Sequence, residues 1–141
     1  MQRANLPLLL AFSALLVLTA CSGTWVEDPR NFKRVFDFDK PPEVKMIHSY
    51  YWKSPHWTVE YRYYIALEGP RKFGDGLTDA SLMTPATADQ NQLDSCGDSK
   101  PQWFLPKPFS HYDAWKPKGD AGYRIFRDKD AGTLFVCDQR L

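Results

Sequence analysis

The three histidines are the first residues to consider for catalysis or metal binding. His48, His56 and His111 are not spaced at i,i+2 or i,i+4, and no cysteine cluster accompanies them. This spacing does not predict a zinc site. Asp113 could orient His111 as a general base, but no serine motif of the nucleophile-elbow type completes a triad. We predict no catalytic residue, no metal and no cofactor.

Acidic residues at Asp128 and Asp130, followed by Gly132, begin a pattern like that of a calcium loop. The pattern then departs from such a loop, because glycine falls on a ligand position and no glutamate closes it. Asp and Gly supply turn geometry directly, so a hairpin turn explains the segment better. Gly74-Asp75-Gly76 is likewise too short to cradle a phosphate.

Three cysteines are present, at Cys21, Cys96 and Cys137. The last two form an even pair, and we expect them to be joined by a disulfide in an oxidising compartment. The alternative is a catalytic thiol at one of these two positions. Neither cysteine has a histidine close to it in the sequence, which favours the disulfide.

Aromatic residues are frequent, with five Trp, seven Tyr and nine Phe. Such side chains fill the core of a thin sheet, or they lie on the surface as anchors for a protein partner or for sugar rings. We expect most of them in the core. Tyr51 and Tyr64 fall opposite the main apolar rows of their segments, so we expect both to be exposed. Trp103 and Trp115 complete the set of candidate binding residues.

The first twenty residues have the composition of a secretory signal. A short polar start with one basic residue, Arg3, precedes an apolar run over 6–18, which small residues follow. The run is shorter than the roughly 20 apolar residues that a membrane-spanning helix needs. We therefore expect residues 1–20 to be a signal peptide that is removed.

The segment Leu18-Thr19-Ala20-Cys21 resembles the lipobox of bacterial lipoproteins, which has a branched apolar residue, two small residues and the cysteine. The resemblance covers the first 21 residues and implies cleavage before Cys21, a thioether-linked diacylglycerol on its sulfur and an acylated (palmitoylated) amino terminus. Two or more acyl chains hold a protein stably in a membrane. Ser22 resembles the pattern sorted to the outer membrane. We expect a lipid-anchored protein of the cell envelope that faces the periplasm.

The elements expected after the signal form a short tether and one domain. Residues 21–42 are predicted to be the lipidated N-terminus and tether, because they are polar in places and end in two prolines. Their four aromatic residues are too many for a free linker, so we expect part of the segment to lie against the domain. Residues 43–141 are predicted to form a single globular periplasmic domain. Its clearest signal is alternation over 57–67, where the odd residues share one face of a strand. Strand formers over 44–53 predict an antiparallel hairpin with this strand.

The second half of the domain has weaker signals. We predict a loop over 71–101 with one short helix around 86–93, and a helical turn over 109–115. A second hairpin is expected from strands over 123–128 and 133–138. The fold class is therefore α+β, with a small antiparallel sheet of four to five strands from two hairpins, short helices and one disulfide.

The charge balance limits the function. With 18 Lys and Arg against 17 Asp and Glu, the chain lacks the basic field of a nucleic-acid binder. We therefore favour a non-enzymatic protein-binding module in the envelope, with an immunity or inhibitor protein as its sharpest form. The runner-up is an accessory or structural lipoprotein of an envelope assembly. A glycan binder, or a small hydrolase that uses His111 and Asp113, comes third.

Overall fold

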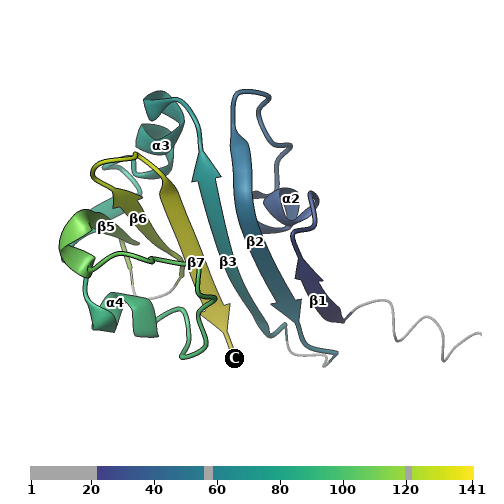
Figure 1. Cartoon of the computed structure of the whole chain (residues 1–141). Coiled ribbons are helices and arrows are strands. Elements are labelled where there is room, and N and C mark those ends of the chain that lie inside the picture. The colour runs from purple at the N-terminus through teal and green to yellow at the C-terminus, as the bar shows by residue number, and fades with distance from the viewer. Residues whose placement is uncertain (1–21, 56–58, 120–121) are drawn as a thin grey trace, which may run out of the picture.

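The fold is built on one antiparallel sheet of seven strands (Figure 1). The computed structural model describes residues 22–55, 59–119 and 122–141. The strands are β1 (Gly23–Val26), β2 (Lys45–Lys53), β3 (Tyr61–Glu68), β4 (Met83–Ala86), β5 (Tyr112–Pro117), β6 (Arg124–Asp128) and β7 (Leu134–Arg140). Their order in the sheet is β1-β2-β3-β7-β6-β5-β4. The predicted antiparallel sheet with short helices is confirmed, but four to five strands was too few.

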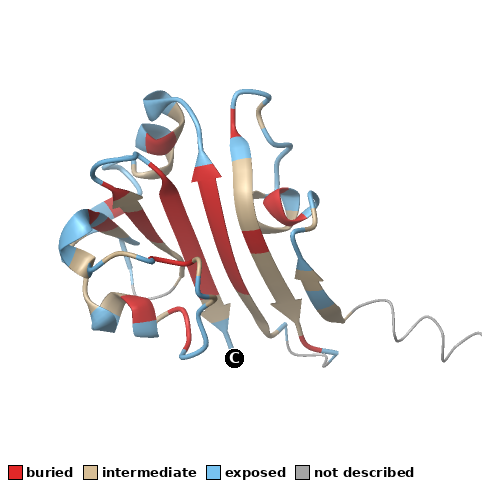
Figure 2. Ribbon diagram, in the orientation of Figure 1, coloured by how far each residue is buried: buried red, intermediate tan, exposed pale blue. Residues whose placement is uncertain are grey.

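Short helices and loops cover both faces of the sheet. Helices α2 (Asn31–Phe36) and α3 (Arg71–Leu77) pack on one face, which we call the α2 face. Helix α4 (Gln90–Asp94), the 3-10 helix η2 (Phe109–His111) and the chain between them pack on the other, the α4 face. Figure 2 shows the buried residues concentrated in the strands between these two layers.

The two predicted hairpins are both present. β2 pairs with β3, and β6 pairs with β7, in antiparallel register. The turn between β6 and β7 contains the Asp128 carboxylate, which accepts the backbone N–H groups of Asp130 and Ala131. Gly132 closes this turn with a φ of 74°, a conformation that favours glycine. The segment is therefore a hairpin turn, as the sequence predicted.

Strand β3 is shorter than predicted and is buried on both faces. The alternation is confirmed for Tyr63, Ile65 and Leu67, which share the core of the α2 face. Tyr64 and Ala66 are buried as well, because the α4 face is also covered. The strand begins at Tyr61, and residues 56–58, which include the start of the predicted strand, lie outside the described residues.

The expected tether folds into the sheet instead. β1 pairs with β2, and α2 packs on the sheet through Phe32, which is buried. The Asn31 amide is buried too, and donates to the Trp25 carbonyl and the Ser49 hydroxyl. Because these contacts hold β1 and α2 on the sheet, the domain starts at Gly23 and not at residue 43.

Two local predictions in the second half are corrected. The helical turn expected over 109–115 stops at His111, and Trp115 lies on β5, where it pairs with Ile125. The helix expected around 86–93 starts later, at Gln90, because the Asp89 carboxylate caps it by accepting the Gln92 N–H. Residues 83–86 form the edge strand β4.

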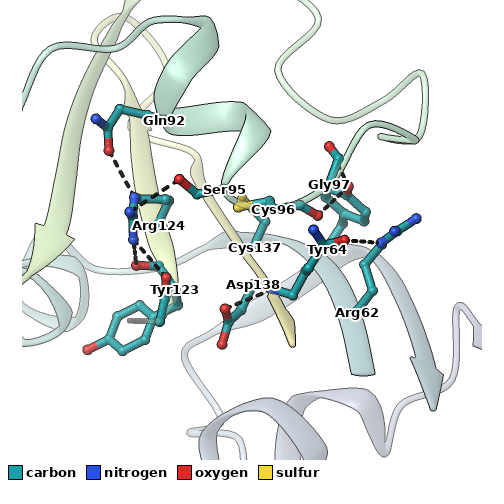
Figure 3. The surroundings of a disulfide bond; sticks show 12 residues. Arg62, Tyr64, Gln92, Ser95, Cys96, Gly97, Tyr123, Arg124, Cys137 and Asp138 are labelled. Atoms are coloured by element: carbon teal, nitrogen blue, oxygen red, sulfur yellow. Dashed lines mark hydrogen bonds between the residues drawn. A yellow bond between two sulfur atoms is a disulfide. The ribbon is translucent and has the colours of Figure 1, made fainter. Parts of the chain in front are cut away.

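The predicted disulfide is present. Cys96, at the end of α4, is bonded to Cys137 in β7, the central strand of the sheet (Figure 3). The Tyr64 hydroxyl donates to the Cys96 carbonyl at 2.8 Å, and Arg124 in β6 donates to Gln92 and Ser95. These bonds fix α4 and the chain that follows it over the sheet.

Candidate functional site

Four aromatic side chains cross three neighbouring strands on the α2 face. Trp25 of β1, Tyr51 of β2 and Tyr63 of β3 occupy one register row, and Tyr61 lies two residues before Tyr63. The ring centroids are 6.0 Å apart for Trp25 and Tyr51, and 6.2 Å apart for Tyr51 and Tyr63. Tyr61 lies 6.1 Å from Tyr63. We call these four residues the aromatic row.

Most of the aromatic row stays in contact with solvent. Trp25, Tyr51 and Tyr61 are half-buried, whereas Tyr63 is 7% exposed. Helices α2 and α3 bury the other end of this face, where Phe32 lies near Phe73. The row is therefore one part of the α2 face on which aromatic rings remain partly open; Phe36, Phe73, Trp115 and Tyr123 on this face are half-buried as well.

The groups around the row are fixed by polar contacts. The Arg34 guanidinium lies 4.5 Å from the centre of the Trp25 ring, a cation–π distance. The same guanidinium donates to Asp28 at 3.1 Å and to the Asn31 amide oxygen at 2.6 Å. These bonds hold both the cation and the indole before any partner arrives.

The tyrosine hydroxyls of the row are neutral at physiological pH. Burial raises the pKa of Tyr61 to about 12, and the hydrogen bond that Tyr61 donates to Asp138 at 2.8 Å acts in the same direction. Burial also raises the pKa of Tyr51. Neutral phenols donate and accept hydrogen bonds while their rings bury apolar area.

The composition of the row suits binding better than catalysis. Trp, Tyr and Arg are the residues most enriched at the energetic centres of protein interfaces. Their rings bury a large area with few rotatable bonds, so little entropy is lost on binding. The row contains no nucleophile paired with a base.

The four predicted binding residues lie in different parts of the fold and do not form one site. Tyr51 belongs to the aromatic row, but it is half-buried on the same face as Tyr63 and not exposed on the opposite face, as was expected. Tyr64 was predicted to be exposed and is instead 0% exposed, because α4 and the chain after it cover its face of β3. Trp103 is half-buried on that same α4 face, where it stacks on His48 at 5.1 Å. Trp115 lies on β5 beneath the Arg127 guanidinium, 5.3 Å away.

Two residues of the aromatic row, Trp25 and Tyr61, were not among the binding residues predicted from the sequence. Trp25 was assigned to a tether, and only its pairing with β2 reveals its place. Tyr61 lies in the predicted strand on the face assigned to the core. Its alternation with Tyr63 was the available signal, but the sequence does not show that helix cover ends before Tyr61.

Charged residues line a hollow at the end of the sheet that lies opposite the aromatic row. An open hollow of about 550 Å³ lies between the β3–α3 connection and the β6–β7 turn. Asp128 is buried there and pairs with Lys107 at 2.7 Å. Burial raises the pKa of Asp128, but hydrogen bonds from Lys107 and from backbone N–H groups outweigh it and lower the pKa. The pair thus anchors the turn.

The pairing considered for a hydrolase is not formed. His111 Nδ1 lies 3.4 Å from Asp130 and not beside Asp113, which instead lies 3.8 Å from Lys129. Asp113 therefore does not orient His111. In the described part of the chain, no group of three or more His, Cys, Asp or Glu could hold a metal ion.

The lipidation site predicted at Cys21 lies outside the described residues. Among the residues that are described, no helix has the length and apolar character needed to cross a membrane. Comparison of the chain with protein-family models, with curated proteins and with solved structures finds no match.

Proposed function

We propose that the protein is a lipoprotein of the cell envelope that binds another protein and is not an enzyme. A lipid on Cys21 anchors it, in the outer membrane facing the periplasm. The observation that carries the binding role is the aromatic row, in which half-buried rings lie beside an immobilised cation. An immunity or inhibitor protein is the sharpest form of this role.

Two further observations support the proposed location. Residues 1–20 have the order of a secretory signal, and the lipobox-like segment ends at Cys21. The disulfide between Cys96 and Cys137 is of the kind that persists outside the cytosol. A small domain with a rigid aromatic surface can bind a partner without large rearrangement, because its anchors are already in place.

The proposal is tested by capture of the intact lipidated protein from its own cells, with quantitative mass spectrometry. We expect one protein in a one-to-one ratio, and a tenfold or greater loss of it with Tyr51→Ala, since truncation of an interface anchor costs about 2 kcal/mol or more. Leu82→Ala is the matched control, because Leu82 is exposed and lies outside the row. Equal recovery with both variants would contradict binding through the row.

The same capture separates the alternatives. Recovery of several envelope subunits together would favour the accessory or structural lipoprotein of an envelope assembly. Recovery of cell-wall glycan without a protein would favour a glycan binder, a role that aromatic rings also suit because sugar rings stack on them. The deletion phenotype adds a second criterion, since an immunity protein is expendable when its toxin is absent.

A further inference from the structure

One end of the sheet gathers four strand ends in a single row. β1 and β3 start there, and β2 and β7 finish there (Figure 1). The residues paired across this row are Gly23, Lys53, Tyr61 and Arg140. We call it the N-terminal end of the sheet, because the chain leaves it toward Cys21.

The connection from this end to the proposed lipid is very short. Ser22 is the only residue between Cys21 and β1. A residue spans at most about 3.6 Å, so the Cα atoms of Cys21 and Gly23 are at most about 7 Å apart. The headgroup region of one leaflet is itself about 5–7 Å thick. A lipid on Cys21 thus leaves no length for the domain to stand clear of the membrane.

We infer that the N-terminal end of the sheet rests on the phospholipid headgroups, with the strands pointing away from the bilayer. The inference depends on the proposed lipidation of Cys21. It adds to that proposal a defined surface and a defined orientation for the domain.

Exposed apolar side chains at the N-terminal end of the sheet are suited to contact with a phospholipid surface. Val59 and Leu141 are large apolar residues that are 55% and 72% exposed. Both flank the row, since Val59 precedes Tyr61 and Leu141 follows Arg140. Apolar side chains of this kind lose contact with water when they enter the boundary between headgroups and acyl chains.

Cations at this end are available to lipid phosphates. Lys53 and Arg140 form no ion pair with any residue that the structure describes. Arg and Lys bind phosphate through charge-assisted hydrogen bonds. Glu60 is also at this end, so the attraction is to individual phosphates and not to a strongly anionic surface.

The opposite end of the sheet stands well away from the bilayer. β3 has eight residues, and at about 3.3 Å per residue its last residue lies about 23 Å beyond its first. The β6–β7 turn, which includes Ala131, is at that far end. A probe at 131 and a probe at 141 therefore report very different depths.

The test uses the full-length lipidated protein in vesicles of phosphatidylethanolamine and phosphatidylglycerol that carry a nitroxide on the headgroup. Leu141→Cys and Ala131→Cys each introduce one free thiol for a fluorophore, because Cys96 and Cys137 form a disulfide and the proposed lipid occupies the sulfur of Cys21. We expect severalfold stronger quenching at 141 than at 131. Equal quenching at both positions, in protein that floats with the vesicles, would overturn the orientation and leave the lipid anchor intact.

Two controls separate the remaining outcomes. Protein that carries no lipid by mass and does not float would remove the anchor itself, and with it the orientation. Lys53→Glu combined with Arg140→Glu, in the Leu141→Cys background, should reduce the quenching at 141. Unchanged quenching in that variant would overturn the contact between these cations and lipid phosphate.

Discussion

The tyrosines of β3 serve two purposes that depend on which face they occupy. Tyr61 faces the partly open surface and hydrogen-bonds to Asp138. Tyr64 faces the covered side, where its ring lies 4.9 Å from Phe104 and its hydroxyl donates to the Cys96 carbonyl. A buried carbonyl that loses its donor costs free energy. Tyr64 is thus a structural residue that joins the sheet to the end of α4.

Replacement of Tyr64 by Phe should lower the free energy of unfolding by about 1–2 kcal/mol, because the Cys96 carbonyl loses its partner. Chemical denaturation measures the loss. Tyr50→Phe is the matched control, since Tyr50 pairs with Tyr64 across the sheet but is only half-buried. An equal effect from both variants would contradict the role of this hydrogen bond.

The same comparison has a defined pH dependence. Burial raises the pKa of Tyr64 from 10.0 to about 12, so the folded state favours the neutral phenol. A raised pKa contributes stability below the unfolded value, and this contribution is lost as pH rises from about 10 toward 12. The stability difference between the wild type and Tyr64→Phe should therefore shrink above pH 10.

At the residue scale, local pattern did not predict the exposure of the candidate tyrosines. Tyr51 was expected to be exposed and opposite the apolar row, but it is half-buried and lies on the same face as Tyr63. Tyr64 is buried because Phe104 and Leu105, which lie about forty residues later in the chain, cover it. Trp25 was missed because a four-residue strand has too few positions for alternation to be recognised.

Elements with strong local signals were predictable, and elements that depend on distant pairing were not. Both hairpins were found, because each joins two alternating segments through a turn. The pairing of β3 with β7 connects residues that are 67 (Leu67 and Leu134) to 79 (Tyr61 and Arg140) positions apart, and no local pattern specifies it. Edge strands β1 and β4 have four residues each and depend on β2 and β5 for their pairing.

Removal of the disulfide should loosen the layer that covers the α4 face. Cys96 and Cys137 are 41 residues apart, and the chain-entropy relation for such a loop gives about 4 kcal/mol of stabilisation. The double variant Cys96→Ala, Cys137→Ala should lose a stability of this size in urea unfolding. Reduced wild type serves as the control. A loss below about 1 kcal/mol in both would show that packing of Phe104 and Leu93 holds this layer without the bond.

At the scale of the whole molecule, the aromatic row lies close to the point at which the proposed lipid is attached. Trp25 lies two residues after Gly23, so the aromatic row is close to the N-terminal end of the sheet. If that end rests on headgroups, a partner of the row must itself reach the membrane surface. The charged hollow beside Asp128 lies at the far end of the sheet, which in the proposed orientation points away from the membrane.

The most direct test of the binding role is photo-crosslinking in intact cells, with benzoylphenylalanine in place of Tyr51. We predict one covalent product with a single envelope protein. The same probe in place of Leu82, which is exposed and precedes β4 at the opposite edge of the sheet from β1, should not give that product. Absence of a protein adduct from position 51, or the same adducts from both positions, would contradict a protein-binding function for the aromatic row.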